Sequence, residues 1–216
     1  MRDFVIEQIR KNKVIAIIRG ASAEECLPIA EALYRGGIRL MEITYNQKAP
    51  ENWEETAQTL RGLVEAFRGK MIFGAGTVVN PYQVSLTAEA GGEFIVSPNT
   101  NEAVIAATRE RGLVSVPGAM TPTEILAAHD AGADFVKLFP AGTLGIPYLK
   151  AICAPLGHIE FLATTGITAD NAKDFLDAGA KALGIGGALA DRKAIEAGEY
   201  EKLTEAAEKI LAAIRA

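Results

Sequence analysis

The stretch TPTEILAAHDAGADFVKLFPAG, residues 121–142, contains one helix-to-strand unit whose pattern recurs along the whole chain. Thr121, followed three residues later by Glu124 and with proline at the first helical position, predicts a capped helix start. Gly132 fits the left-handed turn that closes a helix. The next run, DFVKLFP (134–140), has the pattern of a short buried strand. The fold therefore depends on how often this unit repeats.

Eight short apolar runs share this strand pattern, at residues 14–20, 38–44, 71–77, 93–98, 113–118, 134–140, 159–166 and 181–187. Helical patterns lie between them, and Ser22 before Glu25 repeats the capping signal of Thr121. Most of these helices are expected to end at a glycine in a left-handed turn, at Gly36, Gly91, Gly112, Gly132 and Gly179.

Eight βα units in 216 residues predict an α/β protein with a (β/α)8 TIM barrel, formed as one domain over residues 1–216. The alternative is an open doubly wound sheet, which eight regular units without a midpoint switch make less favourable. A leading helix over about 3–12 is expected to cover the N-terminal end of the barrel. The last stretch, 190–216, is expected to supply the closing helices.

Composition narrows the class of function. A formal net charge of -5 with no basic run argues against a nucleic-acid partner. No apolar stretch approaches the roughly 18 residues that span a membrane, and the N-terminal residues lack the apolar run of a signal peptide. The two cysteines and two histidines are too scattered to suggest a metal site. We therefore expect a cytoplasmic protein with no metal, no cofactor and no membrane or nucleic-acid partner.

Lys137 stands in the middle of the apolar strand 134–140, where helices are expected to cover the outer face. One interpretation is a packed stem with its amine in solvent or in an ion pair with Glu42. The alternative is catalytic, because an amine in an apolar site loses proton affinity and can attack a carbonyl to form a Schiff base. Lys137 shares its strand parity with Phe135 and Phe139, so it should face the barrel interior. We favour the catalytic interpretation.

Other polar residues fall late in their strands, where barrel chemistry takes place. Arg19 ends the first strand, Glu42 lies on the inward parity of the second, and Thr77 ends the third. Glu42 could be a structural partner of Lys137 or Arg19. Schiff-base chemistry also needs a group that moves protons, and a carboxylate close to Lys137 can do so. We therefore expect these side chains to converge on one mouth.

Two glycine-rich turns, TTGIT (164–168) and GIGGAL (184–189), follow the last two strands. The loops at these places in a barrel frequently bind phosphate through backbone N–H groups. The structural alternative is that glycine only makes the turns. We favour a phosphate-binding role for Thr164, Thr165, Gly166, Gly186 and Gly187.

The motifs MEIT, GAGTV, SPN, VPGAMTPTE, VKLFPA and the pair TTGI and GIGG, in this order, resemble the class I KDPG/KHG aldolases. The resemblance covers essentially the whole chain. It implies a homotrimer that needs no metal and reversibly splits a 2-keto-4-hydroxy acid, 2-dehydro-3-deoxy-6-phosphogluconate or 4-hydroxy-2-oxoglutarate, into pyruvate and an aldehyde. That reaction belongs to carbohydrate metabolism of the Entner–Doudoroff type.

Several residue roles are implied by this resemblance. Lys137 matches the Schiff-base lysine, Glu42 the proton-transfer glutamate and Thr77 the threonine beside the pyruvate carboxylate. Arg19 lies where many members have an arginine. Pro98 and Phe139 either wall the pyruvate pocket or belong to ordinary barrel packing.

The chain departs from the family pattern at three places. Asn46 stands where some members have an arginine that clamps the substrate carboxylate. Many relatives read PTGG where this chain reads ATTG (163–166), and Gly187 stands where relatives have serine. Asn46 makes the chain more similar to the 2-dehydro-3-deoxy-6-phosphogalactonate aldolases, which are the alternative within the family. Thr165 could supply the hydroxyl that Gly187 lacks, or the substrate could be unphosphorylated.

Two rivals remain at this level. One is another phosphate-binding barrel enzyme, such as an isomerase or a phosphate-ester synthase, which would not need Lys137. The other is a non-catalytic sugar-phosphate-binding barrel, in which Lys137 and Glu42 could be replaced without loss of binding.

Overall fold

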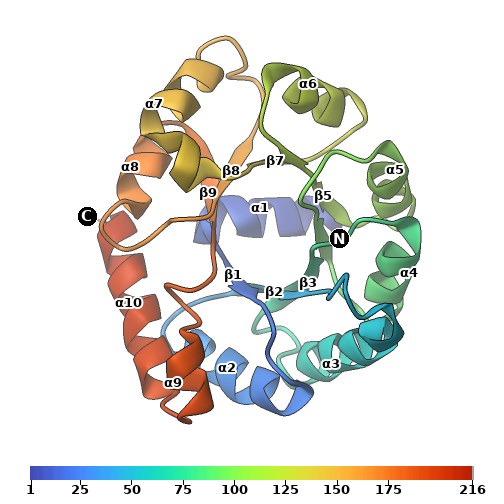
Figure 1. The fold of residues 1–216 in the computed structure, drawn as a ribbon, viewed down its shortest axis with the longest axis vertical. Helices are drawn as coiled ribbons and strands as arrows, with labels where there is room; N and C mark the ends of the chain where they lie inside the picture. Colours follow the sequence, from blue (N-terminus) through green and yellow to red (C-terminus); the bar gives the residue numbers. More distant parts are fainter. Residues whose placement is uncertain (216) are drawn as a thin grey trace.

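The computed structural model describes residues 1–215 and forms a barrel of parallel strands surrounded by helices (Figure 1). The strand order is β5-β4-β3-β2-β1-β9-β8-β7-β6. Each of the eight expected strands is present, which confirms the TIM-barrel prediction. The strands are β1 (Val14–Ile18), β2 (Leu40–Thr44), β3 (Ile72–Gly76), β4 (Phe94–Val96), β5 (Val114–Val116), β6 (Gly118–Ala119), β7 (Val136–Leu138), β8 (Phe161–Thr164) and β9 (Ala180–Ile185).

The ninth strand arises because the expected fifth strand is divided at Pro117 into β5 and β6. Proline has no N–H to donate to a ladder, so the regular pairing is interrupted there. The barrel still closes across this point: Phe135 N donates to Ser115 O at 3.2 Å and Lys137 N donates to Pro117 O at 2.8 Å. The two pieces therefore serve as one barrel strand, and the interruption lies beside Lys137.

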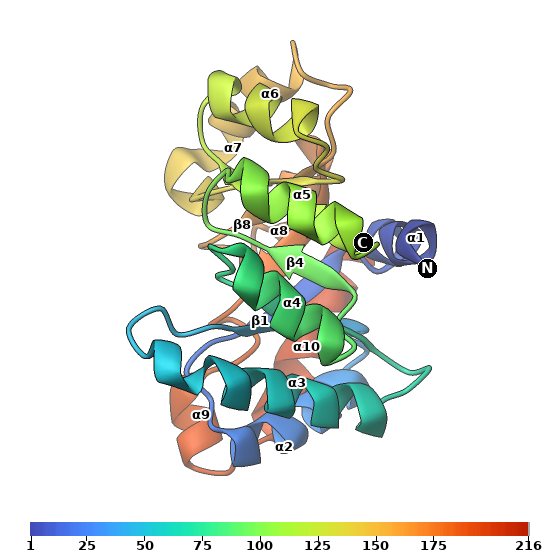
Figure 2. The same ribbon diagram turned by 90° about the vertical axis from the view of Figure 1, so that its right-hand side faces the viewer.

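The helices form a ring outside the strands (Figures 1 and 2). Both expected capping boxes are present, at Ser22 with Glu25 and at Thr121 with Glu124. None of the helices within residues 1–215 is long and apolar enough to cross a membrane. The ring consists of α2 (Ala23–Arg35), the short 3-10 helix η1 (Pro50–Asn52), α3 (Trp53–Ala66), α4 (Pro81–Glu89), α5 (Glu102–Glu110), α6 (Pro122–Asp130), α7 (Ala141–Cys153), α8 (Ala172–Asp177), α9 (Arg192–Glu196) and α10 (Glu201–Arg215).

One helix end differs from the expectation. Gly36 adopts an ordinary right-handed conformation (φ -69°), and the left-handed residue is Gly37 (φ 97°). Glycine is needed at position 36 for a steric reason, because a Cβ there would lie 2.5 Å from the Cβ of Ala207 on α10. The other four expected glycines have positive φ, as predicted.

Helix α1 (Arg2–Asn12) closes one end of the barrel, as expected from the sequence (Figure 1). Val5 and Ile9 are fully buried and pack among inward-facing strand residues. Figure 2 shows α1 on one side of the barrel and the loop between β2 and α3 on the opposite side. The β2–α3 loop therefore marks the carboxyl ends of the strands, where active sites of such barrels lie.

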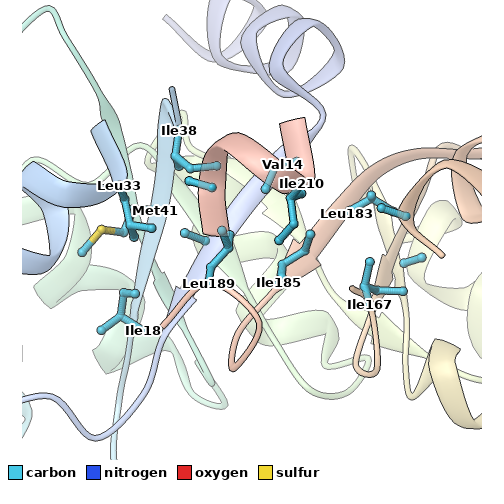
Figure 3. Close-up of a cluster of buried hydrophobic side chains, with 14 of the residues drawn as sticks. Val14, Ile18, Leu33, Ile38, Met41, Ile167, Leu183, Ile185, Leu189 and Ile210 are labelled. Carbon is cyan, nitrogen blue, oxygen red and sulfur yellow. The ribbon is translucent and has the colours of Figure 1, made fainter. Parts of the chain in front are cut away.

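Strand residues alternate between the interior and the helix layer. Ile15 and Leu40 pack inside with α1, whereas Val14, Ile18 and Met41 pack outside against α2 and α10, as Figure 3 shows. The alternation places Glu42 and Lys137 on the inward parity, because they follow Leu40 and Phe135 by two residues. The predicted parity is thus confirmed.

Candidate active site

Glu42 and Lys137 both lie inside the barrel above the apolar layer that α1 closes. Glu42 is 2% exposed on β2, and Lys137 is 7% exposed on β7. Their influence on one another is coulombic, and no hydrogen bond joins them in residues 1–215. A buried acid and a buried amine that remain unpaired can both act on a ligand between them.

The place of the Glu42 carboxyl depends on a glycine in the neighbouring strand. A Cβ on Gly76 of β3 would lie 2.0 Å from Glu42 Oε1, so only glycine leaves room for this carboxyl. Burial raises the pKa of Glu42 to about 7, although the positive charges of Lys137 and Arg19 partly oppose this. A carboxyl that titrates near neutrality can both accept and donate a proton at working pH.

Lys137 has the opposite shift. Burial lowers the pKa of its amine, Glu42 raises it, and the charge of Arg19 lowers it further. Its Nζ lies 5.0 Å from the centre of the Phe139 ring, which is 37% exposed. The amine is thus largely shielded from bulk water. An aromatic face attracts the ammonium form, so it is burial and not the ring that favours the neutral, nucleophilic amine.

Arg19 and Thr77 meet at the mouth, as the sequence predicts. Arg19 Nη2 donates to Thr77 Oγ1 at 3.1 Å. Thr77 is half-buried and has a positive φ of 57°, which is uncommon for a β-branched residue. A guanidinium and a hydroxyl side by side can hold a carboxylate.

The two glycine-rich turns differ in what they expose. Thr164 is buried and its Oγ1 lies 3.5 Å from Leu138 O, so it faces the adjoining strand. Thr165, Gly166 and Gly187 are exposed, and Gly186 is half-buried. Thr165 has a φ of 75°, and its carbonyl accepts a hydrogen bond from Gly142 N at 2.9 Å. Four of the five predicted residues are thus accessible, while Thr164 is a buried neighbour.

The remaining predicted residues take different roles. Phe139 lies beside the Lys137 amine, whereas half-buried Pro98 packs so closely on β6 that a Cβ on Gly118 would lie 2.5 Å from its carbonyl oxygen. Asn46 is occupied within its own loop, because its Oδ1 accepts a hydrogen bond from Lys48 N at 3.0 Å. This bond occupies the oxygen of the amide and leaves its Nδ2 donor, on a residue that lines the cavity beside the mouth, available to a ligand.

Sequence reasoning missed Gln47, whose Nε2 donates to Thr77 O at 2.6 Å. It also missed a cavity of about 690 Å³ beside the mouth, between the β1–α2 turn and the β2–α3 loop. Neither feature has a local sequence signal. The cavity does not include Lys137 or Glu42, and its polar lining includes Arg19, Thr44, Asn46, Gln47 and Thr77.

Known proteins share this architecture. The family model for KDPG and KHG aldolase matches residues 5–206. The probable 2-dehydro-3-deoxy-6-phosphogalactonate aldolase of Rhizobium meliloti is 39% identical over 83% of this chain and 82% of its own length. The KHG/KDPG aldolase of Escherichia coli is 34% identical over 90% of this chain and 88% of its own.

A solved structure is also similar. The KDPG aldolase from Legionella pneumophila, with pyruvate captured as a covalent carbinolamine intermediate, has a TM-score of 0.82 and 29% identity, over 92% of this chain and 94% of that one.

Proposed function

Because this chain belongs to the KDPG and KHG aldolase family and is a pyruvate-dependent aldolase, we propose that Lys137 forms the Schiff base and Glu42 transfers the protons. The observation that carries this assignment is the burial of both groups, unpaired, at the open end of one barrel. Burial leaves the Lys137 amine nucleophilic and brings the pKa of Glu42 to about 7.

The reaction begins when the Lys137 amine attacks C2 of the keto acid to give a carbinolamine, and loss of water gives an iminium. Glu42 takes the proton from the C4 hydroxyl. The C3–C4 bond breaks, its electrons move into the iminium to give an enamine, and the aldehyde leaves. Glu42 returns the proton to C3, and addition of water at C2 releases pyruvate and the free amine. Protein groups alone complete this cycle.

Arg19 and Thr77 bind the carboxylate next to C2. Their hydrogen bond at 3.1 Å leaves further N–H groups of the guanidinium for the ligand. Phe139 covers the reacting carbons from one side, since its ring lies 5.0 Å from the Lys137 Nζ. Pro98 contributes to the wall through the backbone beside β6.

The distal end of the substrate extends toward the turns after β8 and β9, where Thr165, Gly166, Gly186 and Gly187 bind a phosphate. Buried Thr164 supports this turn. Small phosphorylated keto acids are named for relatives of both types, 2-dehydro-3-deoxy-6-phosphogalactonate and KHG/KDPG aldolases. The proposed substrate is therefore 2-dehydro-3-deoxy-6-phosphogluconate or its galactonate epimer, and the aldehyde product is glyceraldehyde 3-phosphate. The unphosphorylated alternative is 4-hydroxy-2-oxoglutarate, which gives glyoxylate.

We also place the enzyme in the cytoplasm as a homotrimer. Two apolar side chains that follow β6 in the sequence are exposed: Met120 by 43% and Leu126, on α6, by 38%. Exposed apolar clusters favour contact with a partner. Light scattering tests the trimer, and Leu126→Glu should shift it toward monomer if this face is the interface.

Borohydride trapping tests the central assignment. The wild-type chain and Lys150→Met, which alters an exposed lysine on α7, should each gain a reduced pyruvate adduct at Lys137. Lys137→Met should fold and gain none. An adduct at another lysine, or none in the wild type, would overturn the mechanism. Family membership already weighs against the non-catalytic barrel and the unrelated phosphate enzymes.

A further inference from the structure

The loop between β2 and α3 reaches across to the end of β3 through one side chain. Gln47 is half-buried, and its Nε2 donates to the carbonyl oxygen of Thr77 at 2.6 Å. Among the described residues, only Gln47 donates to this carbonyl. This hydrogen bond is therefore a direct restraint on the orientation of the Thr77 carbonyl.

The loop around Gln47 is itself fixed. Asn46 O accepts a hydrogen bond from Trp53 Nε1 at 2.9 Å, and Asn46 Oδ1 accepts one from Lys48 N at 3.0 Å. These contacts hold the backbone on both sides of Gln47. Its side chain is thus presented to Thr77 by an ordered loop and not by a free one.

Thr77 needs such support because its conformation is unfavourable. A left-handed φ of 57° is strained for a β-branched residue, and such strain persists only where the surroundings enforce it. The residues on each side are held by backbone bonds, Tyr45 N to Gly76 O at 2.9 Å and Val78 N to Val96 O at 3.2 Å. Thr77 itself is held by side chains alone, Gln47 at its carbonyl and Arg19 at its hydroxyl.

We propose that Gln47 is a positioning residue, which keeps Thr77 in its left-handed conformation and thereby orients the Thr77 hydroxyl toward the carboxylate of the keto acid. The inference rests on the proposed function, because Thr77 has a ligand to orient only if pyruvate binds at Lys137. Gln47 does not touch the reacting carbons. Its loss should therefore weaken binding of the keto acid more than it slows bond cleavage.

Two variants separate the donor from the volume of the side chain. Gln47→Met keeps the length and removes the N–H, and we expect about a tenfold rise in KM with a change in kcat below about threefold. Gln47→Glu at pH 8 turns an acceptor toward the Thr77 carbonyl, and its KM should exceed that of Gln47→Met. Gln58→Met, the same substitution at an exposed position on α3 outside the cavity lining, is the matched control and should resemble the wild type.

A double-variant cycle tests whether Gln47 acts through Thr77. In a Thr77→Ala background the hydroxyl is already missing, so Gln47→Met should raise KM by less than about threefold. The unfolding temperature of every variant should stay close to that of its parent protein, because the hydrogen bond of Gln47 lies in a half-exposed loop. A general loss of structure would instead lower the unfolding temperature and kcat together.

The outcomes distinguish a failure of the proposed function from a failure of the role assigned to Gln47. If the wild type forms no pyruvate adduct at Lys137, the proposed function fails, and this inference fails with it. If the wild type is trapped normally but Gln47→Met and Gln47→Glu keep its KM, the inference alone is overturned. The same holds if the tenfold effect persists in full in the Thr77→Ala background.

Discussion

Arg19 and Thr77 are joined by a hydrogen bond of 3.1 Å that connects the end of β1 to the end of β3, across the strand that carries Glu42. This bond forms one edge of the mouth. It also keeps a positive charge close enough to lower the pKa values of both Glu42 and Lys137. A single arginine thus contributes to binding and to the protonation of both central groups.

Replacement of Arg19 should therefore affect binding first. Arg19→Ala removes the charged donor beside the carboxylate, and we expect KM for pyruvate-forming substrates to rise about thirtyfold. Arg19→Lys keeps the charge but loses the planar fork, so its KM should be intermediate. Steady-state kinetics provide the measurement, with the exposed α3 variant Arg61→Ala as the control. Unchanged KM in Arg19→Ala would remove the arginine from the carboxylate site.

The pH dependence of cleavage should report Glu42. Burial raises its pKa to about 7, so the carboxyl is protonated below that pH and cannot take the C4 hydroxyl proton. We expect kcat/KM to fall about tenfold for each pH unit below about 7. Glu42→Gln should be slow, with no such limb. A wild-type acid limb near 4.5 would contradict the assignment of Glu42 as the base.

Gly76→Ala tests the fit of Glu42 against β3. The added Cβ would lie 2.0 Å from Glu42 Oε1 and must displace the carboxyl. We expect a loss of at least about a hundredfold in kcat, because a misplacement of about 1 Å is enough for such an effect. Gly62→Ala on α3 is the matched control, since nothing lies within 4 Å of its new Cβ. Comparable losses in both variants would refute the steric argument.

Thr165 has a strained left-handed backbone and an exposed side chain. A threonine at a φ of 75° costs on the order of 1 kcal/mol, so Thr165→Gly should keep or slightly raise the free energy of unfolding. If its hydroxyl contacts phosphate, the same change should raise KM for a phosphorylated aldehyde about fivefold in the synthesis direction. KM for glyoxylate should stay constant. Equal effects on both aldehydes would exclude a phosphate-specific role.

Local sequence patterns predict much of the fold. The strand runs and the two capping boxes are short-range features, and the alternation along each strand is enough to predict that Glu42 and Lys137 face the interior. The conformation of Gly36 is not accessible in this way, because Gly36 is constrained by Ala207, about 170 residues away in sequence. The break at Pro117 has a local cause, the missing N–H of proline, which the predicted strand over 113–118 did not take into account.

The parts of the site that sequence could not supply are contacts between different βα units. Gln47 has no local pattern that distinguishes it from any other loop glutamine, and its role appears only when β3 brings Thr77 within 2.6 Å. The need for glycine at Gly76 depends equally on where Glu42 lies in the next strand. Local propensity does not encode such pairs, because the barrel must form before the atoms meet.

Helix α1 offers a test of the fold that is independent of the chemistry. Ile9 is fully buried among the inward residues at the closed end, whereas Phe4 on the same helix is 58% exposed. Ile9→Ala should lower the free energy of unfolding by about 3 kcal/mol, through lost burial and a cavity, while Phe4→Ala should change it by less than about 1 kcal/mol. Chemical denaturation measures both. Because the site lies at the other end, kcat should be unchanged in each folded variant. If Ile9→Ala is fully folded under the assay conditions and still loses much of its kcat, the apolar layer also positions Lys137 and Glu42.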